Sequence, residues 1–296
     1  MRRNGQPPDF VIAGHPKSGT SALYAMLDQH PDIFMSPSKE PGFFGSGDIA
    51  SDKAGARYFA LFAGAEPHQL RGEGTTEYLR SERAASELAS YNPDAKAIAI
   101  LREPASFIWS WHLWQVRHGY HGILDLESAL ADEGRPGSPI VYSDYVRYTE
   151  QIQRFHAALS RDQVLVLIYD DFQESNRDTV KDILQFLEVD ASIEPEPIVR
   201  NVAEGVRFPA TSQAIRRVIS DRGVGARVVH KAIRALTTDG ARRVIMAAVD
   251  RHVLGTEPPP PDPRLMAALR ERFASEVRKV GEYLDRDLCT LWDYPR

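Results

Sequence analysis

The sequence has little of several features that mark common classes of protein. It has one cysteine, Cys289, in 296 residues, which excludes an internal disulfide framework and suits a reducing compartment. No stretch approaches the roughly 18 uncharged apolar residues that a membrane-spanning helix needs, and no apolar run follows the basic start, so we expect no secretion signal. The formal net charge of -5 is not the excess of Lys and Arg that binding to nucleic acid requires. These absences predict a soluble, cytoplasmic protein that does not bind nucleic acid.

What the sequence does contain is an ordinary globular composition, with 43% hydrophobic and 26% charged residues. The chain is long enough to bury a substantial core, and we expect a single domain over residues 1–296. Short β-rich runs alternate with helical patterns, which is typical of a mostly parallel sheet covered by helices. The expected fold class is therefore α/β.

Strand and helix positions follow from the hydrophobic pattern, because continuous apolar runs suit strands that are buried on both faces. The expected strands are Phe10–Gly14, Ala97–Leu101 and Val164–Tyr169, with weaker candidates at Asp32–Met35 and Leu70–Glu73. The expected helices are Thr20–Gln29, a stretch beginning at Pro104, Asp178–Val189 and Arg264–Leu284.

The composition of the sequence changes after residue 201. Residues 215–251 contain nine Lys/Arg against three Asp, and the sequence EPPPPDP at 257–263 acts as a stiff spacer. A solvated helix face is the simplest interpretation of the basic segment. The alternative is a lid that attracts anionic acceptors or touches a membrane surface peripherally. We expect residues 200–260 to form a helical lid within the same domain.

The stretch GHPKSGTS, residues 14–21, predicts an anion-binding loop. A strand that runs through a glycine-containing turn into a helix points free backbone N–H groups at one spot, and the helix N-terminus adds about half a positive charge. A solvated turn rich in Gly and Ser is the plain alternative. The residues expected to bind the anion are Lys17, Ser18, Gly19, Thr20 and Ser21.

The position of the lysine distinguishes this loop from a nucleoside-triphosphate loop. Such a loop carries its lysine directly before the Ser/Thr, whereas Lys17 comes three positions too early. A lysine inside the loop lies at the near end of the anion, where a bond to the phosphate could break. The loop alone does not name the ligand.

Five stretches together resemble sulfotransferases that use 3′-phosphoadenosine 5′-phosphosulfate. PKSGTSAL (16–23) is similar to their 5′-phosphosulfate-binding loop, and KEPGFF (39–44) to a Glu-containing segment of the heparan-sulfate and related bacterial carbohydrate sulfotransferases. AILREPASFIWSW (99–111) is similar to the segment that binds the 3′-phosphate. VLVLIYDDF (164–172) and RDLCTLW (286–292) also match. The resemblance implies a P-loop-like three-layer fold with a central parallel sheet and a helical C-terminal lid.

The resemblance also implies an activity and its residues. The enzyme would be of the EC 2.8.2 type and would transfer a sulfuryl group to a hydroxyl of a carbohydrate, glycolipid or small metabolite. The other product would be 3′-phosphoadenosine 5′-phosphate. Lys17 would stabilise the leaving group, Glu40 would take the acceptor proton, and Arg102 and Ser110 would hold the 3′-phosphate. A sulfuryl group carries less charge than a terminal phosphoryl group, so a protein cation can replace magnesium and we expect no metal.

Two of these assignments have plain alternatives. Glu40 could be a solvated glutamate paired with Lys39, although Phe43 and Phe44 could raise the pKa of its carboxylate by lowering the local dielectric. Arg102 could be an ordinary ion-pair partner of a neighbouring acid such as Glu103.

Candidates for the acceptor side are His15, Glu77, Tyr78 and His112. For His15 we favour a structural or ligand-lining role over that of a base, and for His112, with His118 and His121, partial exposure. The resembled enzymes carry a second lysine where this sequence has Gly74. Either Arg80 or another basic residue replaces it, or the acceptor is handled differently.

Three aromatic residues, Phe107, Trp111 and Trp114, share one helical stripe that predicts core packing, with a wall for adenine or an acceptor ring as the alternative. Two rival functions are a P-loop nucleotide kinase or triphosphatase and a non-catalytic nucleotide-binding protein. The first is disfavoured because the loop lacks the expected lysine and the nearest acidic magnesium motif is Tyr169–Asp171. The sequence determines neither the acceptor nor the oligomeric state.

Overall fold

A computed structural model describes residues 6–47, 49, 51–117, 120, 125–135, 140–198 and 260–295. The expected lid at about 200–260, the basic segment 215–251, His118 and His121 lie outside the described residues. The chain divides into two compact units. The first contains the described parts of residues 1–107, 143–201 and 270–296, and the second those of residues 108–142 and 202–269.

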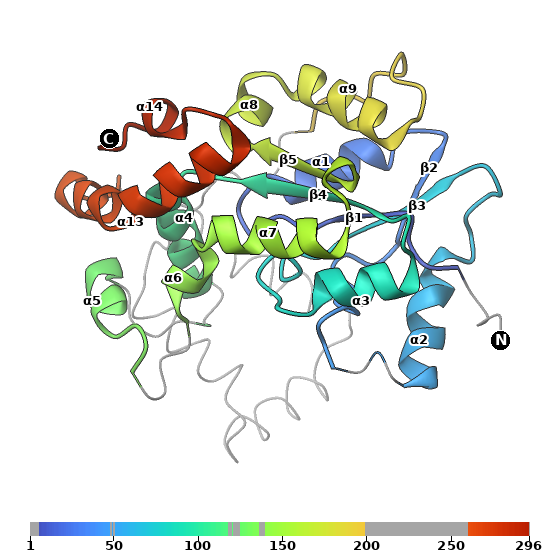
Figure 1. Cartoon of the computed structure of the whole chain (residues 1–296), viewed down its shortest axis with the longest axis horizontal. Coiled ribbons are helices and arrows are strands. Elements are labelled where there is room, and N and C mark those ends of the chain that lie inside the picture. Colours follow the sequence, from blue (N-terminus) through green and yellow to red (C-terminus); the bar gives the residue numbers. More distant parts are fainter. Residues whose placement is uncertain are drawn as a thin grey trace, which may run out of the picture. The chain divides into compact units, whose positions relative to one another are not determined.

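The first unit is built on a five-stranded parallel sheet (Figure 1). The strands are β1 (Phe10–Ile12), β2 (Ile33–Met35), β3 (Leu70–Gly74), β4 (Lys96–Leu101) and β5 (Val164–Ile168), in the order β2-β3-β1-β4-β5. β1 lies in the centre, in register with β3 through Phe10 and Gly72 and with β4 through Phe10 and Lys96. The α/β prediction is confirmed.

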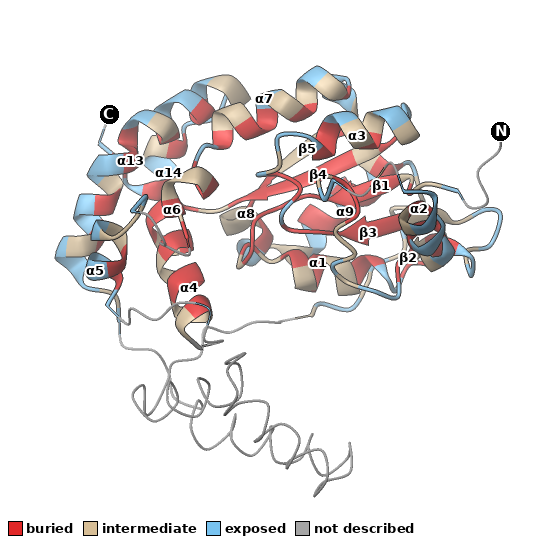
Figure 2. Ribbon diagram, turned by 90° about the horizontal axis from the view of Figure 1, so that it is seen from below, coloured by how far each residue is buried: buried red, intermediate tan, exposed pale blue. Residues whose placement is uncertain are grey.

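Helices cover both faces of this sheet. The flanking helices are α1 (Thr20–Leu27), α3 (Ala84–Tyr91), α7 (Tyr148–Ala158) and α9 (Asn176–Leu187). Figure 2 shows α3 and α7 on one side of the strands and α1 on the other. α1 and α9 pack on one core cluster with β1 and β4. This arrangement is the three-layer fold that the sequence predicts.

The remaining elements are the other helices, most of them short. They are α2 (Asp52–Phe59), η2 (Ala60–Phe62), α4 (Pro104–Arg117), α5 (Leu126–Ala131), α6 (Tyr142–Tyr145), η3 (Arg161–Gln163), α8 (Tyr169–Glu174), α13 (Pro263–Leu284) and α14 (Leu288–Trp292). None of the helices that the structure describes is long and apolar enough to cross a membrane.

Every strand and helix predicted within the described residues is present, with ends that move by two residues at most. Strand β1 ends at Ile12 rather than Gly14, because the chain there turns into the loop before α1. Helix α9 begins two residues early, since Ser175 precedes it as an N-cap and accepts a hydrogen bond from the N–H of Asp178.

The described part of the second unit includes most of α4. Trp111 and Trp114 stack with ring centroids 4.9 Å apart, and Trp114 stacks on Tyr120 at 5.5 Å. Trp111 is buried, as is Phe107 at the end of the first unit, which fits the core-packing interpretation of the aromatic stripe.

Candidate active site

The carboxyl ends of the parallel strands meet at one edge of the sheet, where open α/β sheets bind their ligands. Lys17 follows β1, and Arg102 follows the neighbouring strand β4. Glu40 follows β2, and Thr75 follows β3. The fold therefore brings the main candidate residues of the first unit to this edge.

The loop before α1 has the form of an anion seat. Gly19 occupies the N-cap position with φ +83°, and no side chain caps the helix, so the first N–H groups are left for a ligand. A Cβ at Gly19 would lie 3.1 Å from the ring of Phe172, and one at Gly14 would lie 2.9 Å from Cγ2 of Thr20. Both positions therefore require glycine.

A hydrogen bond between Arg102 and Lys17 connects the two expected phosphate sites. The backbone of Lys17 has φ +62°, a conformation that is uncommon outside glycine and that clusters at functional sites. Its carbonyl oxygen accepts a hydrogen bond of 2.6 Å from Nη1 of Arg102. The half-buried guanidinium also lies 4.7 Å from the ring centroid of Tyr169. Burial lowers the pKa of Arg102, but a guanidinium stays charged in proteins.

Glu103 is engaged elsewhere, so the alternative of an Arg102–Glu103 ion pair is not realised. Its carboxylate accepts hydrogen bonds from the N–H groups of Ala105 (3.0 Å) and Ser106 (2.6 Å), which caps the start of α4. It also accepts one of 2.6 Å from the hydroxyl of Tyr294. Arg102 is left to contact the loop.

Glu40 is held by two neighbours while its side chain stays 36% exposed. Oε2 accepts a hydrogen bond of 2.8 Å from the hydroxyl of Thr76, and Nζ of Lys39 lies 3.3 Å from Oε1. The predicted alternative, pairing with Lys39, is thus present. However, Nζ of Lys39 also donates to Oγ of Ser21 at 3.2 Å, so this ion pair joins the Glu40 segment to the first turn of α1.

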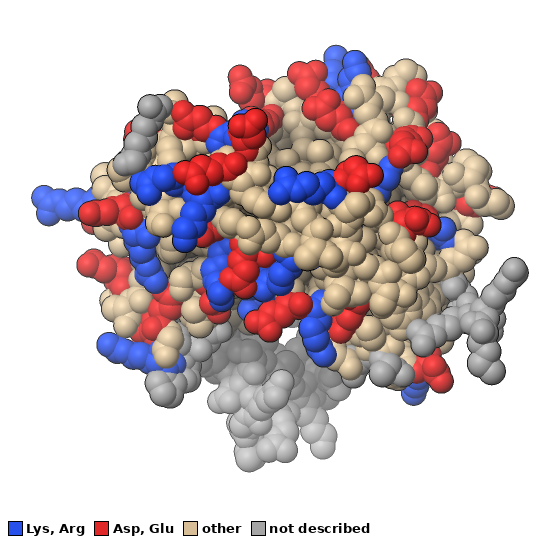
Figure 3. Space-filling model, viewed as in Figure 1, with Lys and Arg blue, Asp and Glu red and all other residues tan. Residues whose placement is uncertain are grey.

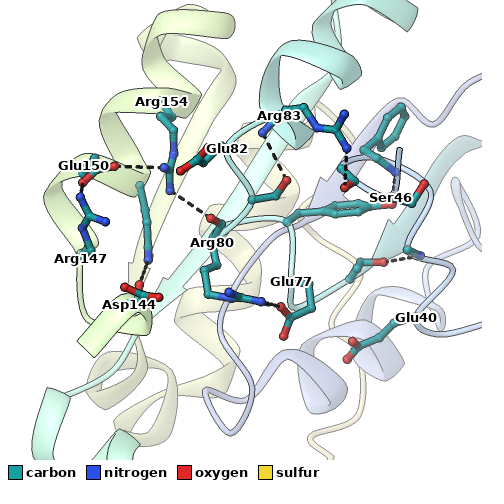
Figure 4. Close-up of a pocket in the computed structure, with 17 residues that line it drawn as sticks. Glu40, Ser46, Glu77, Arg80, Glu82, Arg83, Asp144, Arg147, Glu150 and Arg154 are labelled. Atoms are coloured by element: carbon teal, nitrogen blue, oxygen red, sulfur yellow. Dashed lines mark hydrogen bonds and ion pairs between the residues drawn. The ribbon is translucent and has the colours of Figure 1, made fainter. Parts of the chain in front are cut away.

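A cleft of about 640 Å³ opens beside Glu40. In Figure 4, Glu40 and Asp144 lie on opposite sides of the lining, and the ion pair of Arg80 with Glu77 lies between them. Charges of both signs line the cleft: Glu40, Glu77, Glu82, Asp144 and Glu150 with Arg80, Arg83, Arg147 and Arg154. The described surface of the face in Figure 3 likewise intersperses Lys and Arg with Asp and Glu.

Comparison with known proteins assigns the family. Residues 7–214 match the model of the sulfotransferase domain. The chain belongs to the sulfotransferase family.

The curated relatives resemble only part of this sulfotransferase. It is 33% identical over 97 residues to the membrane-associated sulfotransferase kil1 of Dictyostelium discoideum, which covers 33% of this chain and 21% of that protein. It is 33% identical over 101 residues to human heparan sulfate glucosamine 3-O-sulfotransferase 3B1, covering 34% and 25% of the two chains. The matches thus span a quarter or less of the relatives.

A solved structure supports the fold. A sulfotransferase from Alicyclobacillus acidocaldarius superposes with a TM-score of 0.68, covering 97% of this chain and 98% of the other, at 22% identity. At that identity the likeness supports the fold alone.

The side chain of Lys39 lies beside Gly74, the position at which the resembled enzymes carry a second lysine. A Cβ at Gly74 would lie 3.6 Å from Cε of Lys39, so this side chain fills the space beside the glycine. Arg80 points elsewhere: it pairs with Glu77 and lies over the ring of Tyr145. The basic side chain beside Gly74 is thus that of Lys39, which the sequence analysis did not name for this position, and not that of Arg80.

Phe43 and Phe44 belong to a cluster of their own, while the side chain of Glu40 stays 36% exposed. Both are buried in an aromatic cluster, where Phe43 stacks on Tyr58 with ring centroids 4.3 Å apart. The buried carboxylate near this cluster is instead Glu73, which the sequence interpretation missed. Burial raises the pKa of Glu73 to about 7. The available signal was an acidic residue inside a predicted buried strand.

Neither His15 nor His112 is among the residues that line the cleft; the burial of His15 agrees with the structural role favoured for it, whereas the burial of His112 contradicts the partial exposure expected there. His15 is fully buried, and because burial lowers its pKa to about 3 its imidazole is neutral near pH 7. Its Nε2 lies 2.8 Å from Oε1 of Gln151, whose own amide donates to the carbonyl of Asp144, so Nε2 of His15 carries the proton. His112 is also fully buried, with Nδ1 2.7 Å from the hydroxyl of Tyr142.

The other acceptor-side candidates, Glu77 and Tyr78, do line the cleft. Among the phosphate-site candidates, Ser18 and Thr20 are buried, and Ser18 donates weakly to the carbonyl of Pro16 at 3.5 Å. Ser110 is buried on α4 in the second unit.

The acidic pair after β5 has a structural use. Oδ2 of Asp170 accepts a hydrogen bond of 2.9 Å from the indole N–H of Trp292, and Asp171 pairs with Arg286. Within the described ranges no group of three or more His, Cys, Asp or Glu is placed to hold a metal ion. Both carboxylates therefore have partners within the chain, at Trp292 and Arg286.

Proposed function

We propose that this sulfotransferase moves a sulfuryl group from 3′-phosphoadenosine 5′-phosphosulfate to a hydroxyl of a carbohydrate, glycolipid or small metabolite. The observation that carries the proposal is the hydrogen bond of 2.6 Å between Arg102 and the carbonyl of Lys17. It ties together two cationic sites at neighbouring strand ends. One nucleotide with phosphate at both its 3′ and 5′ positions would fit such a pair.

The 5′ side of the nucleotide is assigned to the loop before α1. Backbone N–H groups there, with the hydroxyls of Ser18, Thr20 and Ser21, would hold the 5′-phosphate, and Gly19 permits close approach. Lys17 would stabilise the negative charge that develops on the bridging oxygen as the sulfur–oxygen bond breaks. Arg102 would bind the 3′-phosphate, because a guanidinium fork makes a strong phosphate clamp; Ser110, which the resemblance pairs with it, stays a prediction.

Glu40 is proposed as the base. The acceptor oxygen forms a bond to sulfur and gives its proton to the carboxylate of Glu40, while the electron pair of the broken bond stays on the 5′-phosphate oxygen. Thr76 holds one carboxylate oxygen in place and Lys39 the other. Lys39, which also contacts Ser21, would supply a second cation at the transferring group, so that no step requires a metal.

The cleft beside Glu40 is proposed as the acceptor side, with Glu77 and Tyr78 among its lining residues. Its lining offers many hydrogen-bonding groups, as a polyhydroxylated acceptor requires. A single catalytic domain over residues 1–296 and a cytoplasmic location remain part of the proposal.

Two experiments test the function. Calorimetry should show tight binding of 3′,5′-bisphosphoadenosine without magnesium and no magnesium-dependent binding of ATP; the reverse would favour a kinase. Incubation with sulfur-labelled donor and a host-cell extract, followed by mass spectrometry, should then identify the compound that gains sulfate. Donor binding without any labelled product would favour the non-catalytic alternative.

A further inference from the structure

Glu73 ends in a buried pocket of hydroxyl groups. It lies near the end of β3 and is fully buried. The hydroxyl of Tyr58 donates to Oε1 at 3.0 Å, and that of Thr75 donates to Oε2 at 2.9 Å. The hydroxyl of Tyr78 is a further neighbour, and it lowers the pKa of this carboxylate. A buried carboxylate needs such partners because burial without them is costly.

The same hydroxyls hold the segment that follows Glu40. The hydroxyl of Thr75 accepts a hydrogen bond of 3.2 Å from the N–H of Gly42. The hydroxyl of Tyr78 accepts two, from the N–H groups of Phe43 at 3.0 Å and Phe44 at 3.3 Å. Three consecutive N–H groups therefore bind two hydroxyls whose protons go to one carboxylate.

This pattern is complete only when Glu73 is ionised. A hydroxyl has one proton and two acceptor positions, and Tyr78 uses both acceptor positions for backbone N–H groups, which leaves its proton for Glu73. A protonated Glu73 would itself need an acceptor. The hydroxyls of Tyr58 and Thr75 already direct their protons at the carboxylate, so one of them would have to turn to accept, and that of Thr75 also holds Gly42.

We propose that Glu73 is a positioning residue for the base: through Thr75 and Tyr78 its carboxylate holds residues 42–44, and protonation of Glu73 releases this segment and displaces Glu40. The catalytic consequence rests on the proposed function, in which Glu40 is the base. The anchoring of the segment does not depend on it.

The groups around Glu73 place this proton exchange in an accessible pH range. Burial is the main cause that raises its pKa, to about 7; the hydroxyl bonds oppose the rise and Glu40 adds to it. Tyr58 and Tyr78 face it with their own pKa raised by burial, and Tyr24 on α1 has its pKa raised to about 12. Lys39 lies beside the adjacent Gly74 and pairs with Glu40.

Hydrogen exchange measured by mass spectrometry tests the anchoring without any acceptor. In the wild-type protein, amides of residues 42–44 should lose protection as the pH falls below about 7, after correction for intrinsic exchange. Glu73→Gln should lower the protection of these amides about 10-fold at pH 8 and abolish the step, which is the change in protection near pH 7. Tyr58→Phe removes a donor that stabilises the anion, so the step should move to higher pH.

Glu87→Gln is the matched control. The carboxylate of Glu87 accepts a hydrogen bond of 2.5 Å from the N–H of Gly45, at the far end of the same segment and outside the hydroxyl network. In this variant the step should stay at the wild-type pH. A pH-independent wild-type exchange rate, or an unmoved step in Tyr58→Phe, overturns the proposal; the latter test holds even where Glu73→Gln fails to fold.

An activity assay tests the positioning role. It measures the release of 3′-phosphoadenosine 5′-phosphate with a mixture of neutral oligosaccharides as acceptors. Glu73→Gln should lower kcat about 10- to 100-fold, leave the KM for the donor unchanged, and remove the acidic limb of the pH profile. Wild-type kcat in this variant would contradict the positioning role. A wild-type protein that is inactive but shows the exchange step would instead contradict the proposed function and leave the anchoring in place.

Discussion

Nη1 of Arg102 lies 2.6 Å from the carbonyl oxygen of Lys17, so the arginine after β4 fixes the loop after β1. The contact has two consequences. The arginine is oriented toward the loop by a contact within the chain, and the carbonyl of Lys17 is held in a conformation that lysine rarely adopts. A ligand at either strand end would therefore affect the other.

Replacing Arg102 with Lys should weaken nucleotide binding selectively. A point charge cannot reproduce the guanidinium fork, and a hydrogen bond to a charged group is worth about 1.5–3 kcal/mol, so affinity for 3′,5′-bisphosphoadenosine should fall about 10- to 100-fold. Affinity for adenosine 5′-monophosphate should change much less, because it lacks the 3′-phosphate. Calorimetry with both nucleotides measures the difference, and equal losses would argue against a 3′-phosphate site.

Replacing Lys17 with Ala should reduce turnover more than binding. Removing one group that stabilises the developing negative charge costs about 10²–10³ in kcat. The exposed Lys181 on α9 is a matched control, and Lys181→Ala should leave kcat unchanged. Steady-state kinetics with calorimetry of the bisphosphate product separates the two effects; a loss confined to binding would remove Lys17 from the chemical step.

Replacing Glu40 with Gln should abolish transfer and spare the nucleotide site. A positioned base is typically worth 10²–10⁴-fold in rate, whereas the amide keeps the size and the contact with Thr76. Affinity for 3′,5′-bisphosphoadenosine should stay within about twofold. The exposed Glu174 provides the control variant Glu174→Gln. Unchanged transfer by Glu40→Gln would require another base.

Lys39 offers a rescue experiment. Lys39→Ala should lower kcat, because it removes the cation between Ser21 and Glu40. The double variant Lys39→Ala, Gly74→Lys should recover a measurable part of that loss, since a Cβ at Gly74 points at the space that Lys39 fills. Gly74→Lys alone should crowd Lys39 and give no gain. Failure of the double variant, with the fold intact by circular dichroism, would show that position 39 is needed for another reason.

The burial of His15 predicts that the stability of the folded state depends on pH. Burial lowers its pKa from 6.5 to about 3, so between these values the unfolded chain binds a proton that the folded protein does not. The folded state therefore loses stability as the pH falls below 6.5, by about 2 kcal/mol at pH 5. Denaturant unfolding at pH 7 and pH 5 should show a smaller loss for His15→Gln than for the wild type. Equal losses would mean that His15 does not titrate in this way.

The sequence predicts the layers and the strand ends well, because these follow from local pattern. Buried apolar runs identify β1, β4 and β5, and the position of Lys17 inside a glycine loop indicates an anion other than a nucleoside triphosphate. The contact between Arg102 and Lys17 is also accessible to reasoning, since parallel neighbouring strands end at the same edge.

The partners of Lys39, Glu73 and His15 could not be predicted in this way. Each depends on what packs around the side chain from distant segments: Gly74 and Ser21 around Lys39, Tyr58 around Glu73, and Gln151 near His15. Local sequence shows that a residue is charged or titratable. Only tertiary packing decides whether it is exposed or buried, and with which partner.

The contacts made by Tyr294 and Trp292 imply an order of assembly. Tyr294 bonds to Glu103, 191 positions away, and Trp292 bonds to Asp170. Both acids lie just after strands that end at the proposed nucleotide site. During synthesis on the ribosome these two hydrogen bonds can form only after the last helix has been made. A nascent chain halted before residue 292 would contain Lys17, Glu40 and Arg102 but would lack both bonds to the residues that follow β4 and β5.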